Sequence, residues 1–112
     1  MSKVHMGEMV AVVLSSNGGS GWFTNHRCEK LLYDEFIVAQ VEKLSSDPSD
    51  TTVNAIESYL LTYYEECAKL VSINTIRNLR VEWVVTGQKF MVSYEDGHET
   101  IAYMDDFDWL EA

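Results

Sequence analysis

The sequence predicts a single α+β domain with a two-layer β-α-α-β-β-β order and an antiparallel meander in its C-terminal half. Three patterns support this class. Residues 79–104 contain three alternating apolar runs separated by Gly-containing turns. Residues 9–14 form a continuous β-branched run, and residues 51–71 repeat apolar side chains at helical spacing. With 112 residues, the chain has room for one core, so residues 1–112 are predicted to be one domain.

The first strand is predicted at residues 9–14, MVAVVL, which precede a run of Ser, Asn and Gly. A continuous apolar run of this length is typical of a strand that is buried on both faces and lies inside the sheet. Residues 1–8 are short, polar and mixed, so we expect them to be loosely ordered.

Two helical regions follow, at residues 28–44 and 51–71. The first is expected to be one helix, or a short turn leading into a helix, with Asp34 as an N-cap. The second predicts a helix that buries one face, and its tyrosines Tyr59, Tyr63 and Tyr64 are interpreted as core rather than as an aromatic binding strip. Residues 45–50 between them form a linker with the single proline.

The predicted meander begins with Leu79, Val81, Trp83 and Val85, which would share one face of a strand, so Trp83 is expected to be buried. Two further strands follow the turns at residues 86–88 and 95–98. The last residues, MDDFDWLEA, are expected to fold back on the sheet because their aromatic side chains favour burial.

The net charge is −10, from 18 acidic and 8 basic residues. Phosphate neutralisation requires a basic patch, so direct nucleic-acid binding is not expected, and a charged partner should be basic. Residues 90–112 contain no Lys or Arg, and Asp105, Asp106 and Asp108 are candidate contacts on an acidic docking face. The alternative is that this face only keeps the protein soluble.

No apolar run reaches eighteen residues, and the N-terminus lacks the pattern of a signal peptide. We therefore expect a cytoplasmic protein with no membrane association. Cys28 and Cys67 lack C-x-x-C spacing, so reduced thiols are expected, and Cys67 is interpreted as a core thiol.

The Gly-rich segment at residues 17–26, NGGSGWFTNH, allows two interpretations. In the structural one, its glycines let the chain leave the strand while Trp22 or Phe23 caps the core. In the functional one, the loop is a recognition surface. The candidate binding residues in the loop are Gly18, Gly19, Gly21, Trp22, Asn25 and His26. The segment matches neither G-x-G-x-x-G nor the P-loop pattern.

Catalysis is not expected from the sequence. The five His and Cys residues lack the close helical spacing of a zinc site, and no oxyanion loop accompanies Cys28. Acidic residues on a solvated turn offer no acid-base pair. We therefore predict no enzyme, no metal and no cofactor.

Several short motifs follow one another over most of the chain after Met9: a strand ending in Gly-Gly and an aromatic residue, an L-L-x-D-x-x-I-V segment at residues 31–38, a V-E-W-V and D-G-x-E-x-I pair at residues 81–101, and a terminal D-W-x-x-A. Their order resembles small, uncharacterised proteins encoded by large tailed bacteriophages, including cyanophages. The chain departs from that pattern at Ser20 and Glu95. The resemblance implies a phage origin, a host-cell cytoplasmic location and no established activity.

Two functions remain open. The first is a non-catalytic protein that binds a host protein with a basic surface, through the acidic face or the Gly-rich loop. The second is a small-ligand binder, in which loop amides of residues 18–21 and the Trp22 ring hold a nucleotide-like molecule.

Overall fold

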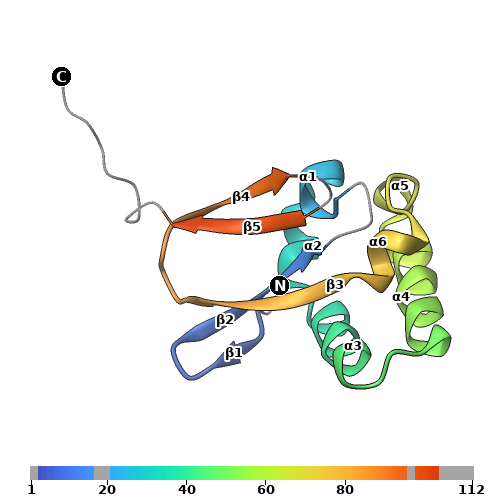
Figure 1. Ribbon diagram of the computed structural model, residues 1–112, viewed down its shortest axis with the longest axis horizontal. Helices are drawn as coiled ribbons and strands as arrows, with labels where there is room; N and C mark the ends of the chain where they lie inside the picture. Colours follow the sequence, from blue (N-terminus) through green and yellow to red (C-terminus); the bar gives the residue numbers. More distant parts are fainter. Residues whose placement is uncertain (1–2, 17–20, 96–97, 104–112) are drawn as a thin grey trace.

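The computed structural model describes residues 3–16, 21–95 and 98–103, and it confirms the α+β class. Figure 1 labels the elements along the chain. They are β1 (His5–Met6), β2 (Met9–Ser15), α1 (Phe23–His26), α2 (Glu29–Tyr33), α3 (Glu35–Ser46), α4 (Asp50–Tyr63), α5 (Glu65–Ala68), α6 (Ile73–Arg77), β3 (Leu79–Val85), β4 (Phe90–Glu95) and β5 (His98–Tyr103). The tail that was expected to fold back on the sheet lies outside these residues.

Strand β2 is the centre of a three-stranded antiparallel sheet with the order β1-β2-β3. It pairs with β3 along its whole length, from Met9 opposite Val85 to Ser15 opposite Leu79. Residues 10–15 are buried, which confirms the prediction of an interior strand. On the other side β2 pairs with β1, where His5 lies opposite Val10. Part of the segment that was expected to be loosely ordered therefore forms a strand.

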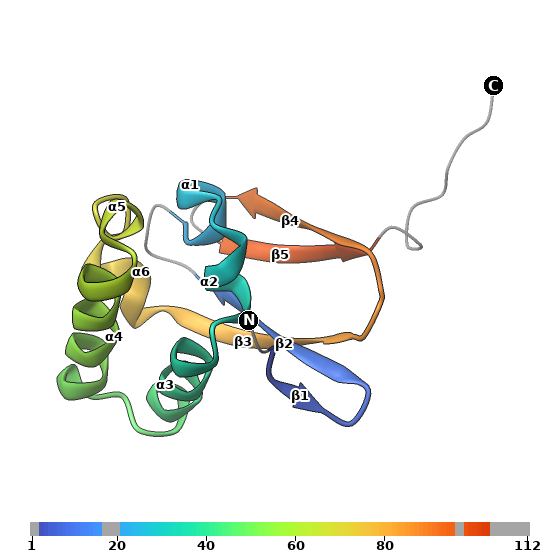
Figure 2. The ribbon, with the colours of Figure 1, turned by 180° about the vertical axis from the view of Figure 1, so that it is seen from behind.

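The two faces of β2 contribute to two separate parts of the core. Ala11 and Val13 pack with α3, α4 and α6 in one cluster. The alternate residues Val10, Val12 and Leu14 pack with α2 and with apolar side chains of β4 and β5 in the other. In Figures 1 and 2, α3 and the β4–β5 hairpin accordingly lie on opposite sides of β3. The second face of the sheet, which the two-layer prediction left open, is covered by this hairpin.

The C-terminal strands are antiparallel as predicted, but they do not form one continuous meander. Strands β4 and β5 pair only with each other, as a two-stranded sheet, whereas β3 pairs with β2. The chain turns after β3 at Gly87, which has a positive φ of 82°. Pairing beside β3 would leave the outer face of β2 open to water. Folding over that face instead buries the apolar sides of β4 and β5 against Val12 and Val84.

The first predicted helical region is two helices, α2 and α3, divided at Asp34. Asp34 is the N-cap of α3, and its Oδ1 accepts a hydrogen bond from the amide of Ile37 at 3.1 Å. This confirms the predicted cap. The other carboxylate oxygen, Oδ2, accepts hydrogen bonds from the hydroxyl groups of Tyr59 at 2.7 Å and Tyr64 at 3.1 Å.

The second predicted helix ends earlier than expected. Helix α4 stops at Tyr63, because Tyr64 has φ −140° and ψ 49°, outside the helical region. The short helix α5 follows, and α6, which the sequence analysis did not predict, leads into β3. Val53, Ile56 and Leu60 are buried as predicted.

The predicted core position of the tyrosine stripe is correct only in part. Tyr59 and Tyr64 are half-buried against the core, but the side chain of Tyr63 is 69% exposed. Phe36 stacks on Tyr59 with 4.4 Å between ring centroids, and Tyr59 lies 4.9 Å from Tyr63. These rings form an aromatic strip across α3 and α4 that is partly open to solvent.

Burial along β3 decreases away from the helices. Leu79 is buried, Val81 and Trp83 are half-buried, and Val85 is 47% exposed. Helices α3 to α6 lie beside the Leu79 end of the strand and leave its far end less covered (Figure 1). The expectation that Trp83 is buried was therefore wrong in degree, although its side chain does face the predicted core.

Trp22 and Trp83 provide a matched test of this packing. Trp22→Ala should lower the free energy of unfolding by about 3 to 5 kcal/mol, because the ring is fully buried. Trp83→Ala should cost only about 1 to 2 kcal/mol, since its side chain is only partly buried. Urea denaturation of both variants measures the difference, and a larger loss for Trp83→Ala would contradict the described packing.

Candidate functional site

The most buried charged residue of the described chain is Glu99 on β5, whose exposed fraction is 0%. Its Oε1 accepts a hydrogen bond from the amide of Ser15 at 2.9 Å. Its Oε2 accepts from the amides of Trp22 at 3.2 Å and Thr24 at 2.7 Å, and from the hydroxyl of Thr24 at 2.7 Å. Four hydrogen-bond donors thus converge on the two oxygens of one buried carboxylate.

These donors come from the strand end and from the start of α1, where backbone amides have no helical partner. The Gly-rich loop thus resembles an anion-binding loop, but the anion that occupies the amides of Trp22 and Thr24 is the side chain of Glu99. The hypothesis of an external nucleotide relied on the amides of residues 18–21 and on the Trp22 ring, and of these the Trp22 ring is fully buried. The amides of residues 18–20 lie outside the described residues.

Position 21 requires glycine because the side chains of Thr24 and Tyr94 lie close to its backbone. Its φ is +95°, and a Cβ at this position would lie 2.7 Å from Oγ1 of Thr24 and 2.9 Å from Cε2 of Tyr94. Both contacts are shorter than side chains tolerate, so only glycine fits. Gly21 is one of the candidate binding residues, and the structure gives it a role in bringing the loop against β4.

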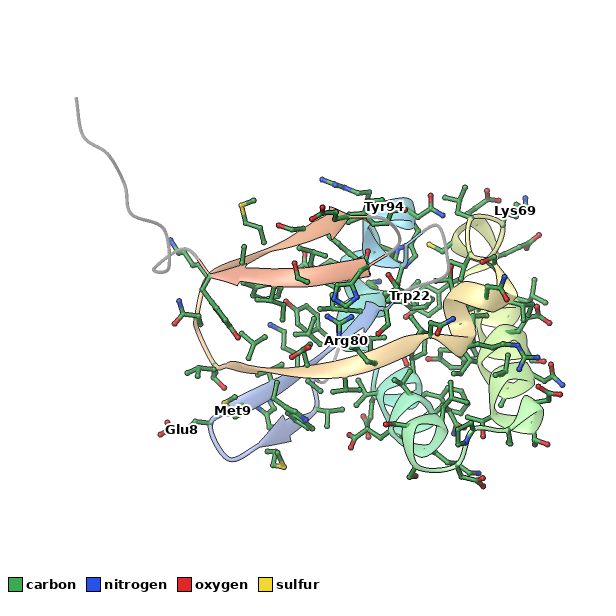
Figure 3. The ribbon with its side chains drawn as sticks, viewed as in Figure 1. Glu8, Met9, Trp22, Lys69, Arg80 and Tyr94 are labelled. Atoms are coloured by element: carbon green, nitrogen blue, oxygen red, sulfur yellow. The ribbon has the colours of Figure 1, made fainter. Side chains whose placement is uncertain are left out.

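Arg80 on β3 holds the same region together from the other side (Figure 3). Its Nη1 donates to the carbonyl of Ser15 at 2.6 Å, and its Nη2 donates to the backbone carbonyl of Glu99. Its Nε donates to Glu82 at 3.1 Å. One guanidinium therefore connects β2, β3 and β5, including two strands that belong to different sheets.

Trp22 is fully buried, in agreement with the core-capping interpretation of the loop, and its ring is not available to a partner. It contacts the His26 ring edge to face at 4.9 Å. The Nδ1 atom of His26 accepts a hydrogen bond from the backbone amide of Cys28 at 2.8 Å. Burial lowers the pKa of His26 to about 4, although the charge of Glu99 acts in the opposite direction.

The remaining predicted site residues separate into two groups. The side chain of Asn25 donates to the carbonyl of Leu70, which joins α1 to the segment after α5. The structure thus brings Gly21, Trp22, Asn25 and His26 together around α1 in structural contacts. The candidates Gly18, Gly19, Asp105, Asp106 and Asp108 lie outside the described residues.

A cleft that the sequence analysis did not identify lies between the α1–α2 segment and β4. Its volume is about 720 Å³, and we call it the α2–β4 cleft. The residues lining it are Phe23, Arg27, Glu29, Leu32, Tyr33, Gln88, Lys89, Phe90, Met91 and Val92. Aromatic rings and aliphatic side chains make up most of the wall, with two cations, Arg27 and Lys89, and one acid, Glu29.

A smaller hollow of about 150 Å³ shares Tyr33, Gln88 and Phe90 with this cleft. It adds a third cation, because Lys3 lies over the ring of Tyr33 at 4.4 Å from its centroid. The three cations, Lys3, Arg27 and Lys89, are far apart in the sequence. None of them is part of a recognisable binding motif. Sequence inspection could not group them because only the folding of β4 over the sheet brings them near one another.

Within the described ranges, no group of three or more His, Cys, Asp or Glu residues could hold a metal ion. No helix in this part of the chain has the length and apolar content that crossing a membrane requires.

Comparison with known proteins found no matching family model, no matching curated protein and no matching solved structure.

The role of Glu99 can be tested with an isosteric substitution. Glu99→Gln should lower the free energy of unfolding by about 3 kcal/mol or more, because an amide presents two donors of its own to a site that already holds four. Glu95→Gln, at an exposed position on the neighbouring strand, is the matched control and should change stability by less than about 0.5 kcal/mol. Equal urea midpoints for the two variants would contradict the described site.

The lowered pKa of His26 predicts that stability is lost in mild acid. An unfolded imidazole binds a proton near pH 6.5, whereas the folded one does so only near pH 4. Between these values the unfolded state binds more protons, so stability falls as the pH falls. Partial solvent access reduces the effect, and we expect a loss of about 1 to 2 kcal/mol between pH 7 and about pH 4.5.

The comparison variant is His26→Asn, whose side-chain oxygen can still accept the amide proton of Cys28 but does not titrate. Chemical denaturation of both proteins at several pH values should show a smaller acid loss for the variant. An identical loss in both proteins would exclude His26 as the cause.

Proposed function

We propose that this protein is a non-catalytic binding protein whose α2–β4 cleft holds a small anionic ligand with a flat ring, such as a nucleotide. The observation that carries the proposal is the composition of the cleft. Arg27 and Lys89 both line it, among the rings of Phe23, Tyr33 and Phe90. Ligand sites usually combine such an apolar wall with a few polar groups, and a volume of about 720 Å³ is within their usual range.

The charge of the cleft supports an anionic ligand. The whole protein has a net charge of −10, which opposes the approach of an anion from a distance. In physiological salt, however, exposed charges more than about 8 Å apart are largely screened. Inside the cleft, the attraction of a ligand therefore depends on the charged side chains that line it. Arg27 and Lys89 outnumber the one acid, Glu29, and the adjoining hollow adds Lys3.

The rings of the cleft support a ligand with a flat part. Arg27 lies 5.9 Å from the centroid of the Phe23 ring, so its guanidinium can face an anionic group while the ring beside it contacts an aromatic base. Aromatic side chains bind such bases by stacking, and the stacking does not depend on which base is present. A phosphate near Arg27 and Lys89 with a base among the rings satisfies both features.

Binding of a host protein with a basic surface is a second candidate. The observation that favours it is the aromatic strip, because Phe36 and Tyr63 are exposed to solvent. Two exposed acids, Glu35 and Glu66, are close to these rings in the sequence. Aromatic rings beside acidic groups suit a partner that carries Arg or Lys. The α2–β4 cleft supports the first candidate more strongly, because its volume fits a small molecule and its cations, Arg27 and Lys89, fit an anionic group.

Titration calorimetry with adenosine monophosphate, adenosine and inorganic phosphate tests the proposed ligand class. The nucleotide should bind more tightly than either part alone, because only it engages the cations and the rings together. Removing one cation, in Arg27→Gln or Lys89→Gln, should weaken binding about tenfold, which corresponds to about 1.4 kcal/mol.

Lys69→Gln is the matched control, since Lys69 is an exposed cation on the segment after α5, where it pairs with Glu66, and does not line the cleft. It should leave the affinity unchanged. The proposal fails if none of the three compounds binds, or if Arg27→Gln and Lys69→Gln bind the nucleotide equally well.

A further inference from the structure

Two segments that are distant in the sequence lie against each other in antiparallel order. At one end the side chain of Asn25 donates to the carbonyl of Leu70. At the other end the hydroxyl of Tyr64 donates to Oδ2 of Asp34 at 3.1 Å. One segment thus runs from residue 25 to residue 34 while the other runs from residue 70 back to residue 64.

The two cysteines of the chain lie between these two hydrogen bonds, one on each segment. Cys28 is the N-cap residue of α2 and Cys67 lies in α5. Both are free thiols, partly buried, and both pack against the same core cluster. Burial raises the pKa of Cys67, and the nearby Cys28 thiol adds to this shift. The two thiols therefore lie close together, one on each of the facing segments.

We propose that Cys28 and Cys67 form a redox-active pair, which a low-molecular-weight disulfide such as oxidised glutathione converts into an intramolecular disulfide. From the sequence both thiols are expected to be reduced, because Cys28 and Cys67 lack C-x-x-C spacing. Only the packing of α5 against the start of α2 brings them together.

The reaction proceeds by two thiol–disulfide exchanges. The raised pKa of Cys67 disfavours this residue as the first attacker, which leaves the thiolate of Cys28 to attack one sulfur of oxidised glutathione. This forms a mixed disulfide and releases one glutathione thiolate. The Cys67 thiolate then attacks the sulfur of Cys28 and releases the second glutathione. The protein loses two protons and two electrons, and one oxidised glutathione becomes two reduced molecules.

The disulfide would join the N-terminus of α2 to α5 across a loop of 39 positions. Closing a loop of this size restricts the unfolded chain and raises stability if the native geometry accepts the bond. Arg27 and Glu29, the sequence neighbours of Cys28, line the α2–β4 cleft. The inference itself does not depend on what that cleft binds.

The test is to incubate the folded, full-length protein with oxidised glutathione, alkylate the remaining thiols and measure the intact mass. The wild-type protein should lose two hydrogens, take up no alkyl group and regain both thiols in dithiothreitol. In Cys28→Ser and Cys67→Ser, the remaining cysteine should either stay alkylatable or hold one glutathione. The oxidised wild type should also unfold at a midpoint about 5 °C or more above that of the reduced form.

The double variant Cys28→Ser/Cys67→Ser controls for effects of glutathione on the rest of the protein, and its midpoint should not respond to oxidation. The inference is overturned if wild-type protein keeps two alkylatable thiols, carries a glutathione on each cysteine or forms only covalent dimers. It is also overturned if the oxidised form melts below the reduced form, because the bond would then require a distorted fold.

Discussion

The buried carboxylate of Glu99 is the interaction on which the arrangement of this fold depends. Among the described residues, the β4–β5 hairpin has no backbone pairing with the main sheet, so side-chain packing and polar contacts hold it in place. Glu99 supplies the polar contacts by accepting hydrogen bonds from the end of β2 and from the start of α1. A charge with an exposed fraction of 0% is tolerated because donors replace its lost hydration. Arg80 adds a second connection, from β3 to the backbone of the same residue.

This arrangement determines both walls of the α2–β4 cleft. One wall is the α1–α2 segment, whose start is held by the contact of Thr24 with Glu99. The other wall is β4, which is paired with the strand that carries Glu99. Two amides of the Gly-rich segment, those of Trp22 and Thr24, hold the side chain of Glu99 and thereby position the α1 wall of the cleft. An external anion would instead meet the side chains of Arg27 and Lys89.

On the other face of the sheet, Asp34 has a corresponding role among the helices. It caps α3 and accepts hydrogen bonds from Tyr59 and Tyr64 on the α4–α5 side. Burial, followed by these hydrogen bonds to Asp34, raises the pKa values of both tyrosines, that of Tyr64 to about 12. The same packing brings Cys28 beside Cys67. A disulfide there would add a covalent connection where the structure already has hydrogen bonds, which is why we expect it to stabilise the fold and not to rearrange it.

The sequence by itself determined the features that depend on neighbouring residues. Its apolar patterns located the interior strand β2 and the start of helix α4, although they extended that helix to residue 71, and an acid before an apolar stripe identified Asp34 as a cap. The tertiary structure decided which elements meet. Glu99 reads as a solvated acid beside a turn, because its donors are 75 to 84 residues away. For the same reason Trp22 could be assigned either to the core or to the surface, and β3 and β4 looked like paired neighbours. Local periodicity specifies secondary structure, but it carries no information about which face a hairpin will cover. That choice follows from burying the second face of β2, and it creates the α2–β4 cleft.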